Sequence, residues 1–168
     1  MANYKTKTDA GECIFCEIAK GKIKPLGDGL IWEDKNYMAW LSPFPNTEGF
    51  AMIIPKKHYA SDVLKMEDKA LLKFILAAKK VAKLLEDYFK DVGRVGLIME
   101  GTGIDHAHIK LIPMHGTGQM KKGIWKRYNS EKTDYSKKYT GCLSSADGPM
   151  ADFKKINKLA RKIRAIKS

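Results

Sequence analysis

The chain has 168 residues, of which 44% are hydrophobic and 30% are charged, so it suits one compact domain that buries a substantial core. Its 31 Lys and Arg residues exceed its 19 Asp and Glu residues and give a net charge of +12, which favours an anionic partner such as a nucleotide, a nucleic acid or an acidic surface. No apolar run is long enough to cross a bilayer, and three cysteines are too few for a disulfide framework, so we expect a cytoplasmic protein with reduced thiols and no membrane partner.

The pattern of apolar residues predicts several short strands and one long helix. Residues 1–11 are polar and lysine-rich, and we expect a mobile lead-in there. Strands are predicted at residues 29–33, 37–41, 50–54, 95–99 and 106–112. Helices are predicted at residues 13–19, 66–90 and 150–166, the last two from an apolar stripe with a 3.6-residue period.

The strand predicted at residues 106–112 carries an unusual set of polar side chains. Polar and apolar residues alternate there, which places His106, His108 and Lys110 on one face. The other face, with Ala107 and Ile109, points toward a core. A solvated strand face with two incidental histidines is the plain interpretation of this pattern.

Two other motifs argue against that plain interpretation. Cys13 and Cys16 form a Cys-x-x-Cys pair near the N-terminus, and His58 follows the predicted strand at residues 50–54. Two thiolates and two separated imidazoles are a complete ligand set for tetrahedral zinc, with the fourth ligand supplied by the histidine strand. A redox pair is the alternative for the cysteines, but it requires a βαβ pattern that the surrounding sequence lacks.

The order of these three motifs resembles the histidine triad (HIT) superfamily of nucleotide hydrolases and transferases, in particular its zinc-containing bacterial members. The resemblance covers residues 13–113. It implies an α+β fold, with an antiparallel sheet of about five strands, one long helix packed on it and, in this chain, a C-terminal helical extension. It also implies that Cys13, Cys16, His58 and His106 hold a structural zinc ion, that His108 attacks the α-phosphorus of a nucleotide, and that the protein forms a homodimer.

The sequence departs from the family motif at its third histidine, which is Lys110 here. A lysine ammonium is a compact phosphate-binding charge, so Lys110 is a second candidate catalytic residue. His115 is a candidate to supply the missing imidazole, with a surface histidine as the alternative.

The resemblance also suggests residues for a substrate pocket. The hairpin and its following loop correspond to the base and ribose pocket of the family, and Ser42 stands where a ribose-binding acid is usual. Two glycines in the turn before His106 suit a close approach of backbone to phosphate. The candidate substrate-binding residues are therefore Ile31, Trp32, Leu41, Ser42, Phe44, Gly101, Thr102, Gly103 and His115, with core packing as the alternative for each apolar one.

We expect two regions: residues 1–118 as a nucleotide-phosphate domain and residues 119–168 as a basic extension. The extension interleaves aromatic and basic residues, which can stack bases and bind phosphates or can cover an apolar edge. The apolar stripe of its terminal helix predicts docking on the body of the protein, with membrane-surface binding as the lesser alternative.

Two functions follow from these observations. The first is a nucleotide hydrolase or nucleotidyltransferase that acts through a covalent His108 intermediate on a nucleotide or another small phosphate ester. The alternative is a HIT-like module that binds nucleotides or nucleic acid without turning them over, because the third histidine is absent.

Overall fold

The computed structural model describes residues 5–25, 29–131 and 135–166. The chain divides into two compact units, Met1–Lys126 and Arg127–Ser168. The first unit contains the sheet and the candidate site, and the second contains the terminal helix. Of the lead-in predicted at residues 1–11, residues 1–4 lie outside the described residues, and Thr8 accepts a backbone hydrogen bond from Gly11.

The order of elements matches the order predicted from the sequence, with small shifts of their ends. The helices are α1 (Ile14–Ala19), α2 (Asp68–Tyr88) and α3 (Phe153–Arg164), and short 3-10 turns occupy η2 (Val63–Lys65) and η3 (Gly118–Lys122). The strands are β1 (Leu30–Glu33), β2 (Tyr37–Leu41), β3 (Ala51–Pro55), β4 (Val95–Ile98) and β5 (Ile109–Pro113).

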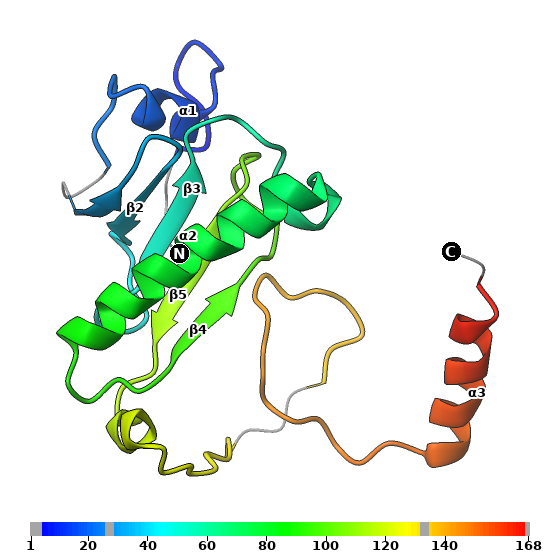
Figure 1. The fold of residues 1–168 in the computed structure, drawn as a ribbon. Coiled ribbons are helices and arrows are strands. Elements are labelled where there is room, and N and C mark those ends of the chain that lie inside the picture. The colour runs from blue at the N-terminus through cyan, green and yellow to red at the C-terminus, as the bar shows by residue number, and fades with distance from the viewer. Residues whose placement is uncertain (1–4, 26–28, 132–134, 167–168) are drawn as a thin grey trace. The chain divides into compact units, whose positions relative to one another are not determined.

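The five strands form one antiparallel sheet in the order β1-β2-β3-β5-β4, with α2 lying across one of its faces (Figure 1). This arrangement confirms the predicted α+β fold with one long helix on a five-stranded sheet. The registers pair Lys110 of β5 with Met52 of β3 on one side and with Ile98 of β4 on the other. Lys110 therefore lies in the interior of the sheet, although β4 itself is an edge strand.

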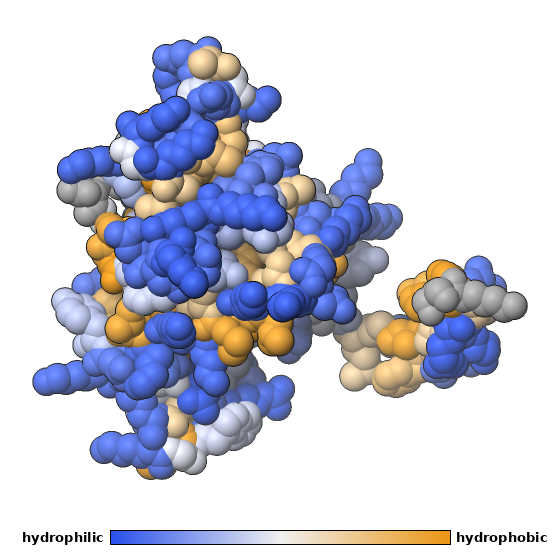
Figure 2. Space-filling model, turned by 45° about the horizontal axis from the view of Figure 1, so that its top comes forward, coloured by the Kyte–Doolittle hydropathy of each residue, from blue (hydrophilic) through white to orange (hydrophobic). Residues whose placement is uncertain are grey.

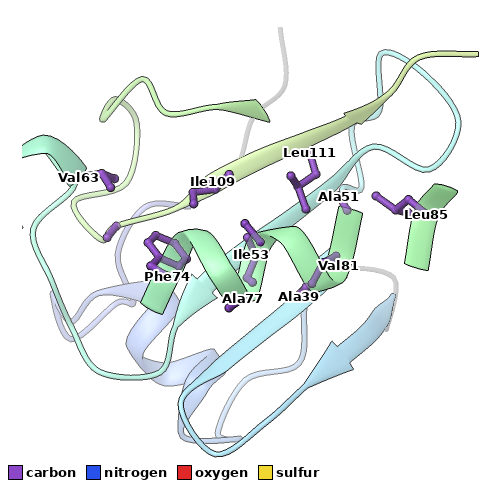
Figure 3. Packing of buried hydrophobic residues seen from close by; sticks show 12 residues of the cluster. Ala39, Ala51, Ile53, Val63, Phe74, Ala77, Val81, Leu85, Ile109 and Leu111 are labelled. Atoms are coloured by element: carbon purple, nitrogen blue, oxygen red, sulfur yellow. The ribbon is translucent and has the colours of Figure 1, made fainter. Parts of the chain in front are cut away.

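The main core lies between the sheet and α2. Successive strand residues alternate between the faces, so that Ala39, Ile53, Ile109 and Leu111 all point toward the helix. Figure 3 shows these side chains with those of α2, among them Phe74, which is fully buried. The helix also buries Ala77, Ala78, Val81 and Leu85, as the 3.6-residue period predicts, whereas Tyr88 at its end is exposed.

The opposite face of the sheet is covered by α1 and its flanking segments. Phe15 and Ile18 of α1 pack there with Trp40 of β2, Ile54 of β3 and Ile104. The prediction of a strand at residues 106–112 with one exposed face is corrected by this layer: β5 begins only at Ile109, and both His106 and His108 are buried.

The second unit contains α3, which begins after Asp152. The Asp152 carboxylate accepts hydrogen bonds from the backbone N–H groups of Lys154 and Lys155 and so caps the helix. Apolar and basic residues lie on different sides of α3, and in Figure 2 the helix shows both orange and blue residues. Docking of this helix on the first unit stays a prediction.

Among the residues that the structure describes, no helix has the length and the apolar composition of a membrane span.

Candidate metal centre and active site

Four side chains from three separate segments converge at the N-terminal end of α1. Cys13 immediately precedes α1 and Cys16 lies on its first turn, His58 follows β3, and His106 precedes β5. One ligand atom of each residue lies within 4.8 Å of the corresponding atoms of the other three. The cluster is therefore able to bind a metal ion.

The distances within the cluster match those of a tetrahedral site. The sulfur of Cys16 lies 3.4 Å from Nδ1 of His58 and 3.5 Å from Nδ1 of His106, and the Cys13 sulfur also lies 3.5 Å from His106 Nδ1. Bonds of about 2.3 Å to sulfur and about 2.0 Å to nitrogen, at tetrahedral angles, place a sulfur and a nitrogen ligand about 3.5 Å apart. The four residues together are thus a candidate ligand set for one four-coordinate ion, since these three S–N separations match and all ligand atoms lie within 4.8 Å of one another.

His106 is oriented for ligation by a backbone group. Its Nε2 lies 2.8 Å from the carbonyl oxygen of Pro55, which can only accept, so Nε2 carries the proton and Nδ1 faces the cysteines with a lone pair. Burial lowers the pKa of His106, which favours the neutral ring that a metal requires. Without a metal, burial raises the pKa of the Cys16 thiol to about 11, with the Cys13 thiol adding to the shift, so metal binding must displace a proton.

His108 lies two residues after His106 on the same segment. Its Nδ1 lies 2.8 Å from the carbonyl oxygen of His106, which assigns the ring proton to Nδ1 and leaves the lone pair on Nε2. The ring is 5% exposed and meets the edge of the Phe15 ring at a centroid distance of 5.9 Å. Burial lowers the pKa of His108, and the Lys110 charge acts in the same direction, so the neutral ring is favoured.

Lys110 lies two residues beyond His108, on the same side of the sheet. Its ammonium forms an ion pair with the carboxylate of Glu100, which is buried, while the Lys110 side chain is 29% exposed. This pair occupies the position where the family motif has a third histidine. The arrangement places a fixed positive charge beside His108 in place of a titrating imidazole.

The structure distributes the predicted pocket residues over several places. Ile31 and Trp32 pack against the core under α2, on the side of the sheet opposite Phe15. Leu41 and Phe44 are exposed, and the Ser42 hydroxyl accepts a hydrogen bond from the backbone of Phe44. Their role in substrate binding stays a prediction.

The turn that leads to His106 is held close to the segment after β3. Gly101 and Gly103 both adopt positive φ angles, and a Cβ at Gly101 would lie 3.1 Å from the carbonyl oxygen of Ser61. The Asp105 carboxylate accepts a hydrogen bond from the backbone N–H of Ser61. Thr102, between the glycines, is exposed.

His115 lies beyond the other end of β5 from His108. Its Nδ1 lies 3.0 Å from the Asp91 carboxylate, and its Nε2 lies 3.0 Å from the carbonyl oxygen of Glu48. The structure therefore places this imidazole with the loop before β3 and the end of α2, apart from the metal cluster.

Three residues near His108 were not singled out from the sequence. Phe15 and Trp40 pack against each other on the His108 side of the sheet, with ring centroids 5.4 Å apart. Glu100 follows β4 and reaches Lys110 across the β4–β5 pairing. The pairing of Glu100 with Lys110 depends on the register of β4 and β5, and the position of Phe15 depends on how α1 docks, so the sequence pattern alone indicated neither.

Fold and site together define a class of protein: an α+β domain in which a two-cysteine, two-histidine cluster adjoins a buried, neutral histidine. The sequence comparisons place the chain within one family of that class. The HIT domain family matches residues 26–117, and the chain belongs to this family.

Individual relatives agree with this assignment. An uncharacterised HIT-like protein of Mycoplasma genitalium is 33% identical over 132 residues, which are 76% of this chain and 87% of the relative. An adenosine 5'-monophosphoramidase of Saccharomyces cerevisiae is 32% identical over 126 residues, 74% of this chain and 75% of the relative. The crystal structure of a HIT family member from Bacillus subtilis superposes with a TM-score of 0.58 at 22% identity, covering 93% of this chain and 98% of that chain, and so shows the same fold.

The contacts of His115 predict a pH-dependent contribution to stability. Both ring nitrogens face acceptors, so only the protonated ring satisfies both. The hydrogen bond to Glu48 and the one to Asp91 raise the pKa of His115 above its ordinary 6.5, while the bond to His115 lowers the pKa of Asp91 below its ordinary 3.8. The pair therefore stabilises the fold fully between these ordinary values, and the contribution is lost as pH rises through the raised His115 pKa or falls through the lowered Asp91 pKa.

We expect the urea midpoint of the wild type to fall more steeply between pH 6 and pH 8, roughly the range around the ordinary histidine pKa, than that of His115→Gln. Urea unfolding followed by circular dichroism at a series of pH values measures both slopes. Equal slopes would show that the His115–Asp91 contact contributes nothing.

Proposed function

We propose that this protein is a nucleotide hydrolase or nucleotidyltransferase that acts at an α-phosphorus through a covalent His108 intermediate. The observation that supports this most directly is the hydrogen bond from His108 Nδ1 to the His106 carbonyl, because it leaves a lone pair on Nε2 of a neutral, buried ring. Membership of the HIT family and similarity to adenosine 5'-monophosphoramidases of two yeasts support the same reaction class.

In the proposed reaction the Nε2 lone pair attacks phosphorus, and the bond to the leaving group breaks with its electron pair. The leaving group takes a proton from solvent, and water or another acceptor then displaces His108 from phosphorus in a second step. Two displacements in line replace one that is more difficult. The Lys110 ammonium, held by Glu100, would offset negative charge on the phosphoryl oxygens and would not carry protons.

We further propose that Cys13, Cys16, His58 and His106 hold zinc as a structural ion. A closed set of four protein ligands leaves no position for substrate, so the metal would tie α1 to β3 and β5 and orient the His106 segment. Ligation requires reduced thiols, which agrees with our proposal of a cytoplasmic location.

We also propose that the protein forms a homodimer through α2 and β4. Leu72, Leu76 and Leu84 of α2 are exposed, as is Leu97 of the edge strand β4, on the same side of the sheet. An unpaired strand edge beside exposed leucines suits pairing with a second copy.

One observation favours a second function, a non-catalytic module that binds nucleotides or nucleic acid. Lys110 and Glu100 form an ion pair where the family has its third imidazole, so a group that exchanges protons near neutral pH is absent from that position. The two functions differ in whether a product forms.

Removing the proposed nucleophile should abolish turnover. We expect His108→Ala to lower the rate by about a thousandfold or more on adenosine polyphosphates, nucleoside phosphoramidates or adenylated nucleic acid ends, measured by chromatography of the products. Lys110→Met should reduce the rate by about ten- to a hundredfold through loss of charge stabilisation, and Lys79→Met, an exposed lysine of α2, should leave it unchanged.

Intact-mass spectrometry of the wild type should show a nucleotidyl adduct that is absent from His108→Ala. An adduct that persists until an acceptor is added would assign a transferase. Product formation that survives His108→Ala would rule out the proposed nucleophile, and binding without any product would favour the second function.

Removing a metal ligand should affect stability more than chemistry. Because structural zinc contributes on the order of 10 kcal/mol to small domains, we expect Cys13→Ala and His58→Ala to lose bound zinc and to lower Tm by about 10 °C or more. Cys142→Ala removes an exposed cysteine outside the cluster and should change neither quantity. Metal analysis and thermal scans test this, and a zinc-free Cys13→Ala protein of full stability would contradict it.

A charged residue introduced into the proposed dimer interface tests whether the protein forms this homodimer. Leu76→Glu should shift the sedimentation coefficient from dimer to monomer, because the carboxylate would be buried against an apolar partner. Leu143→Glu places the same charge in the second unit and should leave the dimer intact. A wild type that sediments as a monomer would refute the proposed assembly.

A further inference from the structure

A cavity of about 320 Å³ lies between the turn that joins β1 to β2, the segment after β3 and the first turns of α2. Five lysines line this cavity, namely Lys35, Lys56, Lys57, Lys69 and Lys73. We call the cavity the lysine pocket. The metal ligands, His108 and Lys110 are not among its lining residues. The pocket therefore shares no metal ligand and no candidate catalytic residue with the candidate active site, although its lining includes Pro55, whose carbonyl oxygen accepts the hydrogen bond from His106.

The positive charge of the lysine pocket is largely uncompensated. Lys56 forms an ion pair with Glu33 at 2.9 Å. Within the described parts of the chain, the other four lysines form no ion pair. Glu67 is the acidic residue among the lining residues, and it caps α2 by accepting a hydrogen bond from the backbone N–H of Lys69.

This clustering is unfavourable for the folded protein by itself. Lys69 and Lys73 are four residues apart on one helix, where like charges repel. The Lys57 ammonium lies 5.1 Å from the centre of the Tyr59 ring, over its aromatic face. An anion that binds several of these ammonium groups at once would relieve the repulsion.

The chemistry of the lining indicates what kind of anion fits. The ammonium groups, the hydroxyls of Tyr37 and Tyr59 and the Asn36 amide can all donate hydrogen bonds, and acceptors are few. One face of the Tyr37 ring already stacks on Phe74 at 5.7 Å. The lining is thus rich in donors and suits a ligand made of acceptor oxygens.

We propose that the lysine pocket binds a short phosphate chain. Four ammonium groups without an ion pair come from three segments, and several linked phosphates offer each of them acceptor oxygens. The cavity is at the small end of the range of ligand sites, about 300–1,000 Å³, which fits such a chain. Free polyphosphate and the triphosphate tail of a nucleotide share this chemistry.

The test is calorimetric titration of the full, metal-loaded chain with tripolyphosphate at low salt. We expect Lys69→Gln/Lys73→Gln to weaken binding by about tenfold, because two charge contacts are lost. Lys79→Gln/Lys80→Gln removes the same charge from α2 outside the pocket and should change the affinity by less than about twofold. Thermal scans of both double variants establish that they are folded.

The design separates this site from other interactions of phosphate. Heat from metal chelation is common to both double variants and cancels in their difference. Performing the titrations in His108→Ala as well removes the proposed nucleophile, so the pocket is tested whether or not the proposed reaction occurs. A parallel titration with ATP assigns the source of the phosphate chain: weakening by the same factor supports a nucleotide tail, and weakening of tripolyphosphate alone supports free polyphosphate.

Three results would overturn the proposal. The first is the absence of tripolyphosphate binding, and the second is equal weakening in the two double variants, which would indicate attraction by net charge alone. The third is a result in which Lys69→Gln/Lys73→Gln weakens the binding of a single-stranded oligonucleotide but does not weaken the binding of tripolyphosphate.

Discussion

The convergence of Cys13, Cys16, His58 and His106 is the constraint on which the candidate site depends. The cysteines are 42 residues or more away from their histidine partners in the sequence, yet the ligand atoms of all four residues lie within 4.8 Å of one another. This cluster joins α1 to the segments that flank β3 and β5. Because His108 is bonded to the carbonyl of His106, whatever fixes His106 also sets the direction of the neighbouring imidazole.

The two faces of the sheet carry different features of the molecule. The α2 side carries the main core and, at its margins, the exposed leucines and the lysine pocket. The α1 side carries the metal cluster, His108 and the Lys110–Glu100 pair. The Phe15 ring packs against His108 on this face, and burial there lowers the pKa of His108 and so favours its neutral form.

Much of this architecture could be predicted from local patterns. The alternation in β2, β3 and β5 and the apolar stripe of α2 depend on neighbouring residues alone, and the predicted elements were confirmed with ends shifted by at most three residues. The cysteine pair and the separated histidines likewise indicated a metal site, and the family resemblance indicated which strand histidine, His106, completes the cluster.

Features that depend on tertiary packing could not be predicted from local sequence patterns. The alternation around His106 continues before β5 begins, so the sequence pattern alone placed two buried histidines on an exposed strand face. The pairing of Lys110 with Glu100 depends on strand register, which a single sequence does not determine.

The acceptors that orient the two motif imidazoles, the carbonyl oxygens of Pro55 and His106, belong to the main chain. Every amino acid provides such an oxygen, so exchanging the side chain at position 55 would leave the acceptor for His106 in place as long as the chain follows the same path. The tautomers are therefore encoded in the course of the backbone, and an insertion or deletion near β3 or β5 would disturb them more than point substitutions among their neighbours.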